Sequence, residues 1–154
     1  MMAPDSDSAT KRGAKKRAAT GSRAEDRSGV RPAPRPGLSG CRLARPGWPH
    51  IYLVDPAGYR RRISNPATHE RLFRDWSGII DVPDLENIAE HAPLDVHTII
   101  IRGDADEAIY VLDAGRRRAL THSLVMDKYW FNWARVLIVR QRLVEQVPLG
   151  EPWK

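Results

Sequence analysis

Two arginine triplets are the polar residues of this chain whose type and spacing most clearly suggest chemistry. They occupy positions 60–62 and 116–118, and each follows a Tyr-bearing apolar run. A planar guanidinium can donate two parallel hydrogen bonds to a carboxylate or a phosphate. Because side chains of a strand alternate between its faces, the outer two arginines of each triplet point the same way. The candidate ligand-binding residues are Tyr52, Arg60, Arg62, Tyr110, Arg116 and Arg118.

The same arginines also have a structural explanation. Asp55 and Asp113 lie across the expected hairpin turns from the triplets, where each carboxylate can pair with an arginine of the following strand. A duplicated scaffold repeats its own supports, so the recurrence of the triplets favours structural pairing. The sequence leaves both explanations open, ligand contact and structural pairing.

The other reactive side chains form no recognisable catalytic or metal-binding pattern. The five histidines lack the His-x-x-x-His and His-Glu-x-x-His spacings of a helix-borne metal site. Ser123 adjoins His122 on an expected helix and cannot face it, and the chain has no Gly-x-Ser-x-Gly turn. The single cysteine, Cys41, excludes an internal disulfide. We therefore expect no enzymatic activity, no metal ion and no cofactor.

The arginine triplets belong to a stretch that occurs twice in the chain. Residues 51–76 and 109–133 align with one extra residue, Ala57, in the first copy, and Trp76 then pairs with Trp133. Each copy predicts a β-hairpin, a strand, a helix, another strand and a short helix, over about 55 residues. A unit of this size has little core of its own. The sequence therefore predicts an α+β fold in which two tandem repeats share one core.

Apolar alternation, turn residues and helix caps place the individual elements. The expected strands span residues 41–45, 51–55, 59–63, 78–82, 98–102, 109–113, 116–120 and 134–140. The expected helices span residues 66–73, 83–91, 122–131 and 141–147. Trp76 and Trp133 end the main helix of each copy, and we expect both to be buried anchors because an indole dominates local packing, with a platform for a ligand as the alternative. Trp153 follows the second copy and is expected to be partly exposed.

The net charge of +6 is concentrated at the start of the chain. Residues 1–38 carry nine Lys/Arg and four acidic residues, a net of +5, which leaves +1 for the rest. This segment has no aromatic residue and is rich in Ala, Ser, Gly and Pro, so we expect a disordered basic tail. It can act as a solvated tail alone, or it can bind nucleic acid or another polyanion through Lys11, Arg12, Lys15, Lys16 and Arg17.

The expected organisation is a tail at 1–38, repeats at 39–95 and 96–150, and a C-terminal tail at 151–154. The start of the chain lacks the apolar core of a secretory signal. The apolar runs of the whole chain are far shorter than the roughly 20 residues that cross a bilayer. We expect a cytoplasmic protein without a membrane span, and the sequence leaves association with a cell surface open.

The motifs IYVLDAGRRRAL, FNW, VLIV and VPLGEPW resemble those of uncharacterised bacterial tandem-repeat modules. Those repeats follow the pattern Val/Ile-Tyr-Leu/Val-Val/Ile/Leu-x-x-Gly, two basic residues, Arg-x-Ile, then aromatic-x-Trp and Ile/Val-Pro-x-Gly. The resemblance covers residues 40–154. It implies an accessory module of surface or secreted proteins, with no catalytic residues. We therefore expect a non-enzymatic binding or interaction module for a cell-envelope glycan or a protein, with nucleic-acid association through the tail as the alternative.

The tail alternative predicts a specific dependence on salt. The full chain should bind a labelled double-stranded DNA, and binding should weaken steeply between about 50 and 200 mM salt because bound lysines and arginines release counterions. Fluorescence anisotropy measures this, and removal of residues 1–38 should abolish it. Salt-independent binding that survives this truncation would contradict the alternative.

Overall fold

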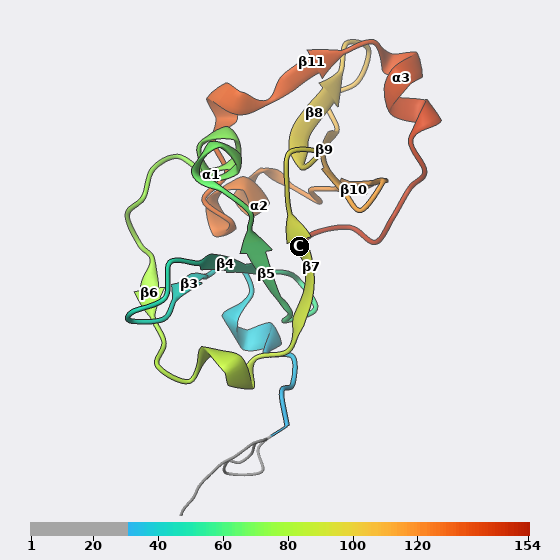
Figure 1. Ribbon diagram of the computed structural model, residues 1–154. Coiled ribbons are helices and arrows are strands. Elements are labelled where there is room, and N and C mark those ends of the chain that lie inside the picture. Colours follow the sequence, from blue (N-terminus) through green and yellow to red (C-terminus); the bar gives the residue numbers. More distant parts are fainter. Residues whose placement is uncertain (1–30) are drawn as a thin grey trace, which may run out of the picture. The chain divides into compact units, whose positions relative to one another are not determined.

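The computed structural model describes residues 31–154, so the basic cluster at 11–17 and most of the expected tail lie outside the described residues. Residues Ala33–Lys154 form one compact unit. Within it, two sheets are combined with short α-helices and 3₁₀ turns (Figure 1), which confirms the predicted α+β class.

The first sheet has five strands in the order β6-β3-β4-β5-β7. A meander of β3 (Arg42–Ala44), β4 (Ile51–Val54) and β5 (Arg60–Ile63) forms its antiparallel centre. Two edge strands, β6 (Ile80–Asp81) and β7 (Glu90–Leu94), pair in parallel with β3 and β5.

The second sheet has the order β10-β9-β8-β11. Its antiparallel centre consists of β8 (Ile99–Gly103), β9 (Ile109–Asp113) and β10 (Arg116–Ala119). The edge strand β11 (Leu137–Val139) pairs in parallel with β8, as β6 does with β3. A parallel bridge from Arg117 to Leu149 stands where β7 joins β5 in the first sheet. Each sheet therefore combines an antiparallel three-stranded centre with parallel pairing at both of its edges.

Three short α-helices lie among the described residues: α1 (Pro66–Leu72), α2 (Ser123–Lys128) and α3 (Gln141–Gln146). Asn65 caps α1 by accepting a hydrogen bond from the Thr68 N–H at 2.9 Å. Pro66 occupies the first helical position. Its lack of a backbone N–H costs no hydrogen bond there, because an N–H at this position would have no acceptor within the helix. None of these helices has the length and apolarity to cross a bilayer.

One apolar core joins the two sheets. Its aromatic centre is an antiparallel bridge between Phe73, which directly follows α1, and Phe131, which lies beyond the end of α2. The sheets pack against this centre from both sides, and Trp153 closes it. The buried members of the core are Leu53, Ile63, Leu72, Phe73, Leu94, Ile100, Val111, Leu120, Val125, Met126, Tyr129, Phe131 and Trp153.

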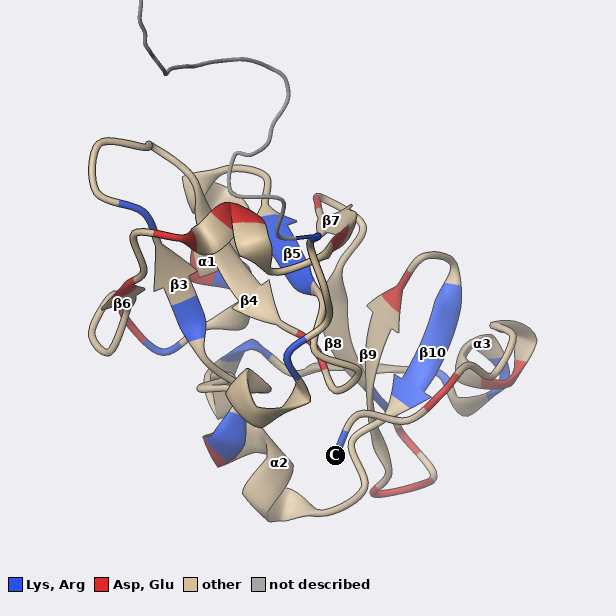
Figure 2. Ribbon diagram, turned by 90° about the horizontal axis from the view of Figure 1, so that it is seen from below, with Lys and Arg blue, Asp and Glu red and all other residues tan. Residues whose placement is uncertain are grey.

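A buried ion network also joins the sheets. Arg61 donates to both carboxylate oxygens of Asp113, at 2.5 and 3.1 Å, although the two residues lie on different sheets. Arg61 also donates to Asp55 at 3.3 Å, and Arg118 donates to Asp113 at 3.1 Å. The strands that carry these arginines, β5 and β10, are coloured blue in Figure 2. This network holds one arginine of each triplet, and Arg60 of the first triplet also pairs with Glu90, at 3.2 Å.

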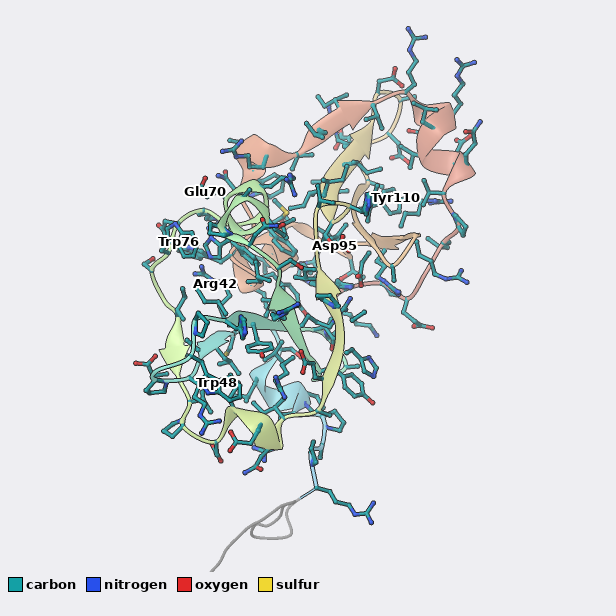
Figure 3. The ribbon with its side chains drawn as sticks, in the orientation of Figure 1. Arg42, Trp48, Glu70, Trp76, Asp95 and Tyr110 are labelled. Atoms are coloured by element: carbon teal, nitrogen blue, oxygen red, sulfur yellow. The ribbon has the colours of Figure 1, made fainter. Side chains whose placement is uncertain are left out.

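Residues 95–98 connect the sheets through a tight turn between β7 and β8. The Thr98 N–H donates to the Asp95 carbonyl at 2.9 Å, and the Thr98 hydroxyl accepts from the Asp95 N–H at 3.0 Å. Figure 3 shows Asp95 at this passage from one sheet to the other.

One predicted element differs in type. Residues 83–91 were expected to be helical, but the structure has only a 3₁₀ turn (Leu85–Asn87), followed by strand β7. Leu85 and Ile88 are buried against the outer face of the first sheet, and the Arg60 N–H donates to the Ala89 carbonyl at 2.9 Å. Pairing with β5 therefore extends the chain beyond Ile88, and Pro93 is tolerated because β7 is an edge strand.

The structure also differs from the expectation at both ends of the repeat region. Residues 33–38 belong to the compact unit rather than to the tail. The Arg35 N–H donates to the Gly58 carbonyl at 2.8 Å, and a Cβ at Gly58 would lie 2.4 Å from the Pro36 nitrogen. At the other end, Trp153 is 2% exposed, because its N–H donates to Ala119 and its ring packs on the aromatic core.

The expectation that Trp76 and Trp133 are buried anchors is not met. They are 45% and 48% exposed, respectively. The aromatic part of the core contains Phe73, Phe131 and Trp153 instead, which pack together. Both tryptophans therefore present much of their indole surface to solvent.

Replacing Asp113 with asparagine should destabilise the fold. Arg61 and Arg118 would lose the carboxylate that neutralises them in a buried site, at a cost of about 3 kcal/mol. Urea unfolding of the full chain measures this, with Asp106→Asn, at an exposed acid, as the matched control. Equal unfolding free energies for the two variants would show that the network is dispensable.

Candidate binding site

A large open hollow beside the half-exposed Trp133 lies in the second half of the chain. It has a volume of about 690 Å³. Strands β8 to β11, the start of α2 and the 3₁₀ turn Trp133–Arg135 surround it. Its lining residues are Arg102, Glu107, Ala108, Ile109, Ala119, Leu120, Thr121, His122, Ser123, Met126, Trp133, Val136 and Ile138.

A row of side chains across three strands forms the floor of this hollow. Arg102 of β8 lies opposite Ile109 of β9 on one side and opposite Ile138 of β11 on the other. Directly opposite residues in neighbouring strands point to the same face of a sheet. Met126, fully buried on α2, closes the floor, and the half-exposed Trp133 forms a wall.

Apart from Arg102 in the floor, the polar groups of the hollow lie at its rim. His122 caps α2, and its Nδ1 accepts a hydrogen bond from the Leu124 N–H at 3.2 Å. In this arrangement the Nε2 carries the proton and can donate to a ligand. Thr121 and Ser123 add hydroxyls on either side, and Glu107 adds a carboxylate. The hollow can therefore hold an apolar group while its rim forms hydrogen bonds.

The first half has a smaller hollow at the corresponding place, of about 130 Å³. Its lining includes Ile51, Ile63, Asn65, His69 and Trp76, which align with Ile109, Leu120, His122, Met126 and Trp133. Here the His69 ring is stacked on the Trp76 indole, with centroids 3.7 Å apart and planes at 8°. The stack fills the space that stays open beside Trp133.

Arg42 holds His69 in that position. Its guanidinium hydrogen-bonds the His69 Nε2 at 2.8 Å and donates to the carbonyls of Asp75 and Ser77. Figure 3 shows Arg42 and Trp76 close together beside α1. Because arginine can only donate, the His69 Nε2 must accept and the ring is neutral. Burial, and then the charge of Arg42, lower the pKa of His69 to about 4.

Asp75 fixes the loop that carries Trp76. Its carboxylate accepts hydrogen bonds from the Ser77 hydroxyl at 2.5 Å, the Ser77 N–H at 2.9 Å and the Trp130 indole N–H at 2.9 Å. The hydrogen bonds from Ser77 and Trp130 lower the pKa of Asp75 to about 2. The closed hollow of the first half is therefore braced from both sides of Trp76.

A second large cavity, of about 460 Å³, lies where the two sheets meet. Its wall contains Arg61, Asp113 and Arg118, which are bonded to one another. Tyr59 and His91 stack at its edge, with ring centroids 3.4 Å apart. Because its strongest charges are already paired, we assign this cavity to the structural network rather than to a ligand.

Two of the predicted ligand-binding residues are built into the first half. Tyr52 and Arg60 are 3% and 8% exposed. The Arg60 guanidinium lies over the Tyr52 ring, 4.8 Å from its centroid, and donates to the Ile88 carbonyl at 2.7 Å. Burial under residues 85–88 therefore excludes both from a surface contact, which corrects the prediction. Arg62 is half-buried opposite Tyr52 on β5.

The residues predicted in the second half do not form a common site either. Tyr110 is half-buried under Arg117, whose guanidinium lies 5.0 Å from the ring centroid. Arg118 is bonded to Asp113, and the exposed Arg116 donates to the Leu149 carbonyl at 3.3 Å. In Figure 3, Tyr110 lies away from the Arg42 and Trp76 side. The six predicted residues thus do not gather at one surface.

Sequence reasoning missed the residues that make the open hollow. The sequence predicts only strands at Arg102 and Ile138 and a loop at Glu107, and it favours Trp133 as a buried anchor. One signal was present, because His69 in the first copy aligns with Met126 in the second. A polar residue replaced by an apolar one in an otherwise repeated unit indicates that the two copies differ at that point.

Comparison with known proteins adds no relative: no protein-family model, no curated protein and no solved structure matches this chain.

Replacing His69 with glutamine should reduce the loss of stability at acidic pH. The unfolded chain takes up a proton near pH 6.5 and the folded chain only near pH 4, so acid favours unfolding between these values. Glutamine keeps an acceptor for Arg42 but gains no proton. Urea unfolding at pH 7 and pH 5 should show a smaller difference for His69→Gln than for wild type. The control is His97→Gln, at an exposed histidine, and equal differences for all three proteins would contradict the assignment.

Proposed function

We propose that this chain is a non-enzymatic interaction module, built from two tandem repeats at 39–95 and 96–150, that binds a polypeptide ligand beside Trp133. One observation carries the proposal: the open apolar hollow, with its half-exposed indole wall, has a counterpart in the first half that is filled by its own side chains. The common order of pairing directions in the two sheets supports the repeat organisation.

The lining of the open hollow favours a polypeptide over a glycan. Apart from Arg102, its floor and walls are aliphatic or aromatic, and its other polar groups lie at the rim. An apolar peptide side chain gains from leaving water in such a site. Sugar hydroxyls buried against Ile109, Leu120 and Met126 would lose hydrogen bonds to water without finding partners.

Two features of the rim support binding rather than catalysis. The His122 Nδ1 is engaged by the Leu124 N–H and cannot serve as a base in this arrangement. Ser123 adjoins His122 at the start of the six-residue helix α2, a position that does not let the two side chains face each other. Nucleic-acid association through the basic residues at 11–17 remains the alternative function.

Selection from a displayed library of random peptides tests the proposal on the full chain. We expect peptides with large apolar side chains, and their binding should fall about tenfold or more in Trp133→Ala, since a buried aromatic contact is lost. Trp76→Ala is the matched control, because the hollow beside Trp76 is closed, and it should bind like wild type. Fluorescence anisotropy of labelled selected peptides measures both variants.

Co-sedimentation with bacterial cell-wall polysaccharide tests whether the ligand is a glycan instead of a polypeptide. A chain that selects no peptide but pellets with the polysaccharide, in a Trp133-dependent manner, would overturn the polypeptide assignment in favour of a glycan. Equal loss of peptide binding in Trp76→Ala and Trp133→Ala would overturn the location of the site.

A further inference from the structure

Strand β11 has an open outer side that is unusually apolar. It is the last strand of its sheet, paired on one side only, with β8. Leu137 and Ile138 are 50% and 61% exposed. Exposed edges are commonly shortened, charged or covered, because an open edge pairs readily with another chain. An edge with two consecutive exposed apolar side chains therefore indicates a contact surface.

The backbone of β11 presents hydrogen-bonding groups on that open side. The Val139 carbonyl accepts from the Asp104 N–H at 2.8 Å, so the polar groups of Val139 point toward the β8 side. Successive residues of a strand direct these groups to opposite edges. The N–H and C=O of Ile138 therefore point outward, where an added strand would find both a donor and an acceptor.

The open edge and the hollow beside Trp133 are continuous. Ile138 belongs to the edge through its backbone and lines the hollow with its side chain. In strand addition, main-chain hydrogen bonds supply affinity and a neighbouring pocket for alternate side chains supplies specificity. Both components are present within β11 and the residues next to it.

The charges around β11 select the occupant. Arg135 precedes the strand, and Arg140 and Arg142 follow it. A second copy of this chain laid antiparallel would bring arginine toward arginine at both ends, which opposes pairing. The chain's own residues 1–32, which precede the compact unit and carry a net charge of +4, are disfavoured for the same reason. An apolar segment with acidic residues at its ends is complementary.

We propose that an extended segment of another protein, apolar at its centre and acidic at its ends, adds to the second sheet as a strand beside β11. One of its apolar side chains enters the hollow beside Trp133. This inference rests on the proposed function and specifies how the polypeptide binds.

Two substitutions at Ile138 separate the backbone contact from the side chain. Ile138→Pro removes the outward N–H, and proline is tolerated at such an edge position. Ile138→Val keeps the N–H in a β-branched residue of similar size. For peptides selected on the full chain from the displayed random library, we expect binding to weaken about tenfold in the proline variant and less than about threefold in the valine variant. Circular dichroism verifies that both variants are folded.

Amide hydrogen exchange provides a second readout that does not depend on a variant. The Ile138 amide of the full chain should exchange more slowly when a selected peptide is bound, because it then donates to the added strand. The Ile80 amide, on edge strand β6 of the first sheet, is the internal control and should not change. Glutamate-to-lysine replacements at the ends of the peptide should weaken binding.

The outcomes distinguish this inference from the function on which it rests. Trp133-dependent peptides whose binding is unchanged by Ile138→Pro, with no slowing at Ile138, would overturn strand addition and leave the interaction function standing. Self-association of the chain that Ile138→Pro abolishes would assign β11 to a second copy instead. Failure to select any Trp133-dependent peptide would overturn both.

Discussion

Arg61 reaches from the first sheet to Asp113 of the second, and the rest of the unit is arranged around this buried contact. The buried carboxylate of Asp113, bonded by Arg61 and Arg118, is stable only while both guanidiniums are in position. Much of the attraction offsets the cost of removing the charges from water. Its main effect is therefore geometric, since few placements of β5 against β9 and β10 satisfy all three side chains.

The same scaffold supports two hollows, and one difference between them is the aligned pair His69 and Met126. His69, held by Arg42, stacks on Trp76 and fills the first hollow. In the second half Met126 is fully buried at the aligned position, and the space beside Trp133 remains open. A flexible thioether adapts to the core, whereas a neutral imidazole needs a polar partner, so the first half contains a buried arginine as well.

Local patterns predicted most of the strands, the Asn65 cap and the α+β class, because alternation and capping depend on near neighbours. They failed where contacts between residues far apart in the sequence determine the local structure. Residues 90–94 became a strand through pairing with β5, and Trp153 became core because it packs on Tyr129 and Phe131. The hollow beside Trp133 could not be predicted for the same reason, since four strands and a helix that are separate in the sequence form its lining.

The turn at residues 95–98 has a consequence for assembly. Neither sheet can keep its inner face from water by itself, so each requires the other as a partner subunit would. The short connection makes that encounter intramolecular, at an effective concentration far above that of any free chain in a cell. Folding of the unit is thereby independent of protein concentration. The two sheets also differ in sequence, so a substitution in one sheet is not repeated in the other, as it would be in a dimer of identical subunits.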